Sequence, residues 1–404
     1  MTLDRAPAAP AHAIGHSTPT VRRLLAAGVG VGVGWSVLHA LLALRWLLDP
    51  GSWPGLDADE RYGVLSLLDR TSTAWTLLAL SGAGLLLALL TRRRGGSSLL
   101  VAAMAVQAAV LGVLAADLGS LVLLGYLAAI VGPATFLVVF TVGAARDRCT
   151  RPWLIGVAAV VAAGMAAGLL RPGTVTDLAG ELGSGFAEHA MPHLHLALLL
   201  AGATIWGTTA MLLRRSATGR CAVCGRPGAA WTGPEAARRW GTVATWIAVA
   251  GPLPYALLRM TWLTPWPVGM PTDGVLEPQM RLFGLGLGFA ALGGAVLTLG
   301  LIRPWGEVWP GWVPGLHGRP VPVRVPVLAG GLVAVALLAA SPAFLAMAVE
   351  RLLAGDLGDA ALVLVFPTLP WGLALAAAVT GYAFRRRGTC ATCGQGEPAL
   401  SVRD

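Results

Sequence analysis

Residues 325–349 read V-P-V-L-A-G-G-L-V-A-V-A-L-L-A-A-S-P-A-F-L-A-M-A-V, with no charged side chain among them. A helix needs about 20 predominantly apolar residues to cross the roughly 30 Å of hydrocarbon in a bilayer. Runs of this kind recur along the chain, at 24–48, 72–91, 97–116, 120–145, 152–170, 193–213, 240–258, 282–302, 325–349 and 360–384. The pattern therefore predicts an all-α, polytopic integral membrane protein with about ten transmembrane helices.

Composition supports a lipid environment. Hydrophobic residues make up 56% of the 404 residues, charged residues make up 12%, and the mean hydropathy is +0.70. A soluble domain carries about 25% charged residues, because water must wet its surface. The net charge of +9 does not indicate a nucleic-acid partner, because the arginines form short clusters at the ends of the apolar runs. We expect the lipid bilayer to be the main partner, and no nucleic acid.

The distribution of arginine predicts the orientation. If the N-terminus is cytoplasmic and the ten runs alternate, the cytoplasmic segments hold 22 arginines against 6 acidic residues, and the outer segments hold 7 against 14. Arginine excess marks the cytoplasmic side. We therefore expect a bacterial inner-membrane protein with both termini cytoplasmic. The predicted parts are a disordered tail over 1–22, a helical bundle over 23–385, and cytoplasmic segments at 214–239 and 386–404.

Two further patterns concern the organisation of the bundle. The stretch H-A-L-L-A-L-R-W-L at 39–47 aligns with Y-A-L-L-R-M-T-W-L at 255–263, and a Trp-Pro pair follows each. This match predicts a parallel repeat of spans 1–4 and 7–10; chance alignment of Leu/Ala-rich helices is the alternative. In the outer segment 171–192, Leu178, Leu182 and Phe186 have helical spacing, which predicts an amphipathic helix lying along the membrane surface.

Four of the five cysteines form two matching C-x-x-C-G motifs, at Cys221 and Cys224 and at Cys390 and Cys393. The predicted topology places both motifs at the cytoplasmic face, so their thiolates can meet at one point. Four thiolates are the set that zinc takes in closed structural sites. We predict a structural Zn²⁺ clip; a redox dithiol, an iron site, or two unrelated pairs of reduced thiols are the alternatives. We expect Cys149 to be a buried thiol rather than a ligand.

A second candidate metal site lies at the outer end of the sixth span, where Glu188, His189, His193 and His195 are clustered. Imidazoles and a carboxylate suit copper or zinc, and a helix histidine can ligate haem. His189 and His193 share a helix face if Pro192 lies in the first turn of the helix. The alternative is an interfacial cluster that hydrogen-bonds to water and backbone.

A third candidate site depends on the repeat. Ionisable residues at membrane depth usually face a cavity or a partner. If spans 1–4 and 7–10 are related, His39 and Tyr255 face each other, with Arg45 and Arg259 above them, and together they form an outward pocket for an anionic or amphipathic ligand. The alternative for both arginines is that they extend to the lipid headgroups.

Two resemblances to known proteins follow from these motifs. The paired C-x-x-C-G motifs resemble the knuckles of zinc ribbons and rubredoxins, which implies a zinc or iron ligand set. The stretch R-P-W-G-E-V-W-P-G-W-V-P-G-L-H-G-R-P-V-P at 303–322, with 255–263, resembles a family of multi-pass membrane proteins of high-GC Gram-positive bacteria that has no assigned activity. This second resemblance implies a source and a topology, and no mechanism.

The functional expectation is a permease-like membrane protein, or one that binds a lipid or another small molecule. The alternatives are a redox, metal-handling or haem protein that uses the outer histidines, and a membrane scaffold that docks a cytoplasmic protein partner. The sequence contains no P-loop, G-x-S-x-G or H-E-x-x-H motif, so an enzymatic activity is left open and is the less favoured expectation.

Overall fold

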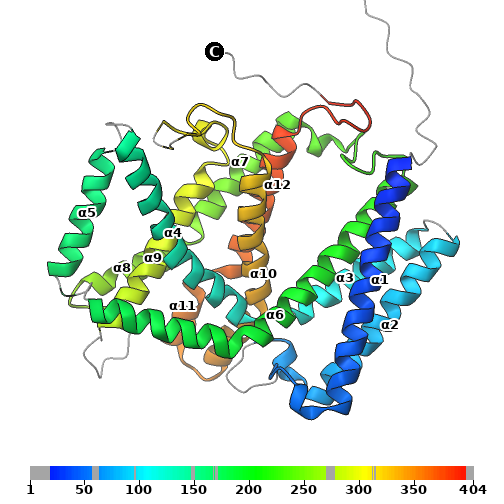
Figure 1. Cartoon of the computed structure of the whole chain (residues 1–404), viewed down its shortest axis with the longest axis horizontal. Helices are drawn as coiled ribbons and strands as arrows, with labels where there is room; N and C mark the ends of the chain where they lie inside the picture. Colours follow the sequence, from blue (N-terminus) through cyan, green and yellow to red (C-terminus); the bar gives the residue numbers. More distant parts are fainter. Residues whose placement is uncertain are drawn as a thin grey trace, which may run out of the picture.

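The computed structural model is built from α-helices (Figure 1). It describes residues 19–56, 63–94, 97–146, 151–166, 168, 172–269, 278–311, 313 and 315–396. Within these ranges β pairing is limited to the isolated bridges Gly63–Asp117 and Val308–Pro320. The helices are α1 (Pro19–Leu48), α2 (Arg70–Arg94), α3 (Ser98–Leu114), α4 (Leu118–Arg146), α5 (Arg151–Ala166), α6 (Pro172–Ala217), α7 (Pro234–Ala250), α8 (Leu253–Met260), α9 (Pro278–Leu299), α10 (Arg324–Leu353), α11 (Leu357–Leu364) and α12 (Thr368–Arg386).

Seven helical stretches among the described residues are long and apolar enough to cross a membrane, which confirms the all-helical, membrane-type prediction. They are Val21–Leu48, Arg70–Arg93, Ala190–Ala217, Pro234–Leu263, Met280–Leu299, Arg324–Leu353 and Leu357–Arg386. The helices α3 and α5 are apolar but shorter. The count of ten stays a prediction, as does the tail over 1–22, of which residues 1–18 lie outside the described ranges.

Two of the predicted spans are interrupted. The run at 240–258 becomes α7 and α8, which meet at Gly251 and Pro252, and the run at 360–384 becomes α11 and α12, which are separated by Val365, Phe366 and Pro367. Proline has no backbone N–H to donate to the preceding turn of a helix. Each break contains such a residue, Pro252 in the first and Pro367 in the second.

The helices α1, α2, α3 and the second half of α6 form a first unit, in which α1 packs on α2, α3 on α6, and α1 on α6. Its core contains Leu77, Met104, Leu111, Leu199 and Trp206, each almost completely buried. These positions repeat at helical spacing along their own helices, whereas residues on the other faces, such as Leu41 on α1, stay 61% exposed. An apolar side chain that faces outward in this way suits a lipid solvent.

The helices α4, α7, α9, α10 and α12 form a second unit. Its closest contact joins α7 to α12, and α12 also packs on α10. A Cβ atom on Gly381 of α12 would lie 2.8 Å from the Cα of Gly241 on α7, so the two backbones approach directly. The helix α4 packs on α9 and α10, not with α1–α3 in the first unit. The parallel repeat of spans 1–4 and 7–10 stays a prediction.

The helix α6 joins the two units. It has Pro192 in its interior, and its first half runs in a different direction from its second half (Figure 1). The expectation that Pro192 lies in a first turn is wrong, because the helix begins twenty residues earlier, at Pro172. The missing N–H and the bulky ring of a proline bend a helix without ending it when packing supports both halves. Residues 172–192 are helical, as the spacing predicts, and their position along the membrane surface stays a prediction.

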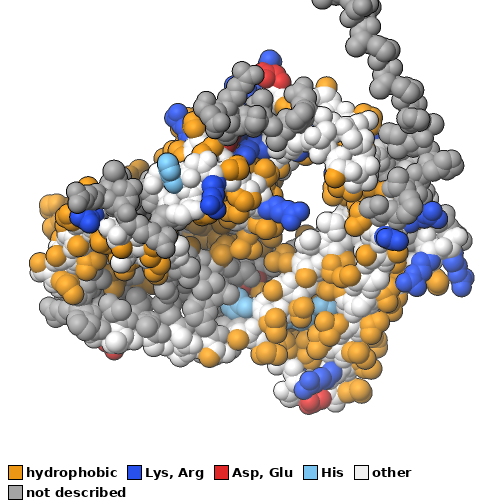
Figure 2. Space-filling model, turned by 45° about the horizontal axis from the view of Figure 1, so that its top comes forward, with side chains coloured by type: hydrophobic (Ala, Val, Ile, Leu, Met, Phe, Trp, Pro, Cys, Tyr) orange, Lys and Arg blue, Asp and Glu red, His pale blue; other side chains and the backbone are white. Residues whose placement is uncertain are grey.

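The direct contacts between helices of the two units are few: α6 meets α4 and α9. A space-filling view shows an opening between the units (Figure 2). The C-terminal ends of α6 and α12, which belong to different units, both lead into cysteine-bearing segments (Figure 1). We refer to this side of the molecule as the cysteine end.

Candidate metal centre

The first cysteine motif is a tight turn directly after α6. The backbone N–H of Cys221 donates to Arg226 O at 2.8 Å, and the N–H of Gly225 donates to Cys221 O at 2.7 Å. Gly225 has a φ of +75°, a conformation that glycine adopts without strain. The turn therefore brings Cys221 and Cys224 to the same side of one loop.

The second motif, after α12, repeats this turn. The N–H of Cys390 donates to Gln395 O at 2.9 Å, the N–H of Gly394 donates to Cys390 O at 2.8 Å, and Gly394 has a φ of +70°. The same residue types at the same spacing thus give the same local structure in two segments that are 169 residues apart.

The two turns meet, and their four sulfurs converge. Cys221 Sγ lies 4.0 Å from Cys390 Sγ, Cys224 Sγ lies 3.6 Å from Cys393 Sγ, and all four lie within 4.8 Å of one another. A disulfide needs sulfurs about 2.05 Å apart, so these are free thiols. Four ligands about 2.3 Å from a tetrahedral zinc stand about 3.8 Å apart, close to the two shorter separations. The cluster can hold a metal ion.

Two arginines clasp the segments to each other. Arg226 of the first segment donates to the carbonyls of Arg387, Gly388 and Gln395 in the second, at 3.2, 3.0 and 2.6 Å. Arg387 of the second segment donates in return to the carbonyls of Cys224 and Thr232, at 3.1 and 2.7 Å. The two guanidinium groups thus bond to loop carbonyls of the opposite segment, and these hydrogen bonds hold the two turns together without a metal.

A third arginine connects the first turn to its helix. Arg215, in the last turn of α6, donates to the carbonyls of Ala222 and Val223 at 3.0 and 3.1 Å. Burial and the neighbouring Arg226 lower the pKa of Arg387, which indicates an excess of positive charge around the sulfurs. A metal bound by four thiolates carries a net charge of about −2 when the metal is divalent, so it would offset this excess.

The thiols themselves differ. Burial opposes the ionisation of Cys390, but the backbone N–H groups of Thr392 and Cys393 and the neighbouring thiols outweigh it and lower the pKa of Cys390 to about 6. Burial raises the pKa of Cys224 to about 12 and also raises that of Cys393. Cys390 therefore ionises more easily than Cys224 and Cys393, and a metal bound by all four sulfurs would displace the protons of those two thiols.

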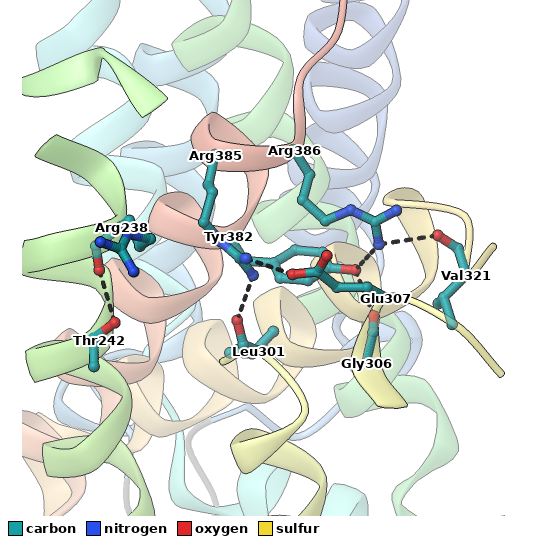
Figure 3. A network of polar contacts seen from close by, with 9 residues as sticks. All are labelled: Arg238, Thr242, Leu301, Gly306, Glu307, Val321, Tyr382, Arg385 and Arg386. Atoms are coloured by element: carbon teal, nitrogen blue, oxygen red, sulfur yellow. Dashed lines mark hydrogen bonds and ion pairs between the residues drawn. The ribbon is translucent and has the colours of Figure 1, made fainter. Parts of the chain in front are cut away.

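A polar network below the second motif fixes the end of α12 (Figure 3). The Tyr382 hydroxyl donates to Gly306 O at 2.7 Å and accepts from Arg386, which also donates to Val321 O. Arg385 forms an ion pair with Glu307 and donates to Leu301 O at 3.0 Å. The proline-rich segment 303–323 is thus attached to α12 through contacts that come just before Cys390.

The predicted outer cluster is only partly described. The backbone of Glu188 and His189 lies in α6, but their side chains are outside the described residues. His193 is half-buried. His195 is 4% exposed, and its ring faces that of His39 on α1 at a centroid distance of 5.4 Å. Among the described residues, the cysteine cluster is the one group of three or more metal-ligating side chains that converges.

The structure places the four predicted pocket residues in separate surroundings. His39 stacks on Trp35 in the first unit, and Arg45 is exposed in the last turn of α1. Tyr255 packs against Phe366 in the second unit. Arg259 lies over the rings of Tyr255 and Trp262, at 5.0 and 4.0 Å from their centroids. The pocket that would unite His39 and Tyr255 stays a prediction.

The reasoning from sequence missed the arginines around the sulfurs. Arg226 occupies the position that Gln395 holds in the second motif, so the two motifs share no repeated signal there. Cys149 lies outside the described residues. No protein-family model, curated protein or solved structure matches the chain. The resemblance to a family of multi-pass membrane proteins therefore stays a prediction.

Proposed function

We propose that the chain is a bacterial inner-membrane protein with ten spans and both termini cytoplasmic, so that the cysteine end faces the cytoplasm. The seven long apolar helices support the membrane part of this proposal. The arginine-rich segments after α6 and α12 support the orientation, because positive charge collects on the cytoplasmic side. The parallel repeat of spans 1–4 and 7–10 is retained as part of the proposal.

The metal of the cysteine site is proposed to be a structural Zn²⁺. The convergence of four sulfurs within 4.8 Å of one another and the surrounding arginines support a closed four-thiolate site without an open coordination position. Elemental analysis of the purified full chain tests this proposal. We expect one zinc per chain, lost in the Cys221→Ser/Cys390→Ser variant and retained in Cys149→Ser. Iron in place of zinc, or no metal, would contradict it.

The function proposed for the whole protein is permease-like transport, or binding of a lipid or another small molecule. The observation that carries it is the arrangement of the two units. They touch through α6, are separated by an opening, and are tied together again at the cysteine end. A ligand that enters between two such units contacts both of them, and the metal clip sets their spacing.

Native mass spectrometry of the detergent-purified chain tests this function, with phosphatidylglycerol, phosphatidylethanolamine and glycerol added in turn. We expect at least one of them to stay bound after release from the micelle and to raise the thermal unfolding midpoint, because a ligand that binds only the folded state stabilises it. A bare chain whose midpoint none of the three compounds moves would contradict the proposal.

A second candidate function is redox, metal or haem chemistry at the outer end. The observation that favours it is the His39–His195 pair, two buried imidazoles that face each other from different helices. His39 Nδ1 bonds to Trp35 O at 3.1 Å, which leaves Nε2 as the free ligand atom. A visible spectrum and a copper analysis of the same purified sample test it; colourless, copper-free protein removes the candidate.

A further inference from the structure

The buried polar side chains are concentrated in the first unit. Among the side chains that the structure describes, Thr245, Ser341 and Thr368 are the buried polar residues on helices of the second unit, and the buried Asp117 lies in the connection between α3 and α4. The helices of the first unit carry seven: Ser36, His39, Thr73, Ser81, Gln107, His195 and Thr209. Polar groups are costly in the interior of a membrane bundle and usually mark a functional path there.

The polar groups of the two units also differ in how they are paired. In the second unit, the hydroxyls of Thr245 and Ser341 donate to carbonyls of their own helices, both at 2.7 Å, and Arg281 Nε on α9 is a buried atom without a hydrogen-bond partner. In the first unit, six buried atoms have no hydrogen-bond partner: Ser36 Oγ, His39 Nε2, Thr73 Oγ1, Ser81 Oγ, His195 Nε2 and Trp206 Nε1. Burying a polar group without a hydrogen-bond partner costs about 1–3 kcal/mol. Six such atoms in one unit therefore indicate a bound molecule that forms hydrogen bonds with them.

Four of the residues that carry these atoms, Ser36, His39, His195 and Trp206, lie along one face of α1. His39 faces His195 of α6, and Gly84 of α2 approaches both the Ser36 hydroxyl and the Trp206 ring. One and two turns further along α1, Gly32 lies against the Trp206 ring and Gly28 against the Thr209 hydroxyl. Eleven residues separate Gly28 from His39, which corresponds to about 16 Å of helix, half of the hydrocarbon thickness.

The chemistry of the unpaired atoms defines the occupant. The indole N–H of Trp206 only donates. Because His39 Nδ1 must donate to the Trp35 carbonyl, Nε2 of the neutral ring only accepts. A cation would leave the indole N–H unpaired, and an anion would leave the imidazole lone pair unpaired. A molecule that both donates and accepts pairs with both atoms, and with the hydroxyls between them.

We propose that the core of the first unit is a binding path for small uncharged hydrogen-bonding molecules, with water as its resident occupant and a small polyol or amide as the solute it admits. The inference rests on the proposed small-molecule function and names its ligand class. The seven buried polar residues on the helices of the first unit include no Asp, Glu or Arg, which fits a neutral ligand; the buried Asp117 lies outside these helices, between α3 and α4.

Hydroxyl-radical footprinting of the full chain in detergent tests the hydration of this path, because radicals formed from bound water oxidise the side chains beside it. Trp206 is 0% exposed and Trp371, in the core of the second unit, is 9% exposed. We expect Trp206 to be oxidised severalfold faster than Trp371, against the order of their surface exposure. Oxidation of Trp206 at the rate of Trp371 or more slowly would overturn the proposal.

Stopped-flow light scattering of proteoliposomes tests the solute, with glycerol and urea as probes. We expect both to equilibrate severalfold faster than in protein-free vesicles. The rate should fall in Ser36→Ala and Trp206→Phe and stay unchanged in the matched control Ser341→Ala. Metal content and unfolding midpoint verify that each variant is folded.

The two proposals fail separately. If glycerol and urea enter no faster than in protein-free vesicles while a lipid stays bound in native mass spectrometry, the path is wrong and the small-molecule function stands. If no ligand binds and no solute enters, both are wrong.

Discussion

The two helical units share one solvent and one chain but are held together differently. In the second unit the backbones of α7 and α12 touch at Gly241 and Gly381, and its buried hydroxyls bond within their own helices. In the first unit, large aromatic rings fill spaces beside glycines: the Trp35 ring lies where a Cβ on Gly202 would be, at 2.3 Å, and Trp35 Nε1 donates to Leu198 O. Close backbone contact and polar cross-links are two substitutes for the hydrophobic effect, which does not drive apolar helices together in lipid.

Metal removal is expected to have the largest effect, because the metal site connects the segments that follow α6 and α12 and so links the two units. The metal in a four-cysteine site stabilises a fold by on the order of 10 kcal/mol. Without it, we expect the single thermal transition of the full chain to split into two, one for each unit. Trypsin should then cleave after Arg387, whose side chain donates to the carbonyls of Cys224 and Thr232 when the site is intact. Circular dichroism and timed proteolysis measure both effects.

The Cys221→Ser/Cys390→Ser variant should behave as the chelated protein does, and Cys149→Ser should behave as the unmodified chain. A single transition and unchanged cleavage in the metal-free protein would mean that the arginine clasp alone holds the units together.

The next largest effect is expected at the backbone contact of the second unit. In Gly381→Ala the new methyl group would meet the Cα of Gly241, which cannot rotate away, and overpacking of this kind costs about 1–3 kcal/mol. Gly34→Ala in the first unit is the matched control, since nothing lies within 4 Å of its Cβ position. Alanine favours a helix over glycine by about 1 kcal/mol, so the control should be neutral or stabilised.

Chemical denaturation in mixed micelles measures the free energy of unfolding of both glycine variants. Equal shifts in Gly381→Ala and Gly34→Ala would show that α7 and α12 can separate without cost. Close backbone contact would then not be what stabilises the second unit.

The polar anchor of the second unit at the cysteine end gives a smaller effect. Tyr382→Phe removes the hydroxyl that joins Gly306 O to the Arg386 guanidinium, and a hydrogen bond to a charged group contributes about 1.5–3 kcal/mol. We expect a loss near the lower end of that range, because Arg386 keeps its bond to Val321 O. Tyr255→Phe is the control, because Tyr255 makes ring contacts rather than a hydroxyl hydrogen bond among the described residues.

A loss in Tyr382→Phe no larger than that in the control would mean that the ion pair of Arg385 with Glu307 carries the anchor by itself.

The sequence predicts most of what depends on one segment, and it predicts a contact between two segments only where a repeated motif marks both of them. Apolar length identifies the helices, and the repeated C-x-x-C-G motif predicts matching turns that meet. The packing of α6 against α1 and α3 could not be predicted, because an apolar helix face rich in Leu and Ala does not specify which helix it contacts. The bend at Pro192 depends on packing on both of its sides. Two further contacts also join segments that are far apart in the sequence. They are the ring contact of His39 with His195 and the hydrogen bonds that Arg226 and Arg387 donate to each other's segments.

The smallest expected effect concerns single hydrogen bonds within the membrane. Gln107 of α3 donates to Leu80 O of α2 at 2.8 Å, so it links two helices of the first unit, whereas Ser341 bonds within α10. Hydrogen bonds between membrane helices contribute about 0.6 kcal/mol on average and at most about 1.7 kcal/mol. We therefore expect Gln107→Leu to lower the free energy of unfolding by about 1 kcal/mol, within that range.

Ser341→Ala should leave this free energy nearly unchanged, because the Leu337 carbonyl keeps its bond in the helical ladder when the hydroxyl is removed. Denaturation of the two variants side by side decides whether the polar groups of the first unit hold its helices together. If Gln107→Leu is as stable as Ser341→Ala, the hydrogen bond between α2 and α3 does not stabilise the first unit. Ligand binding is then the role that accounts for the buried polar groups of this unit.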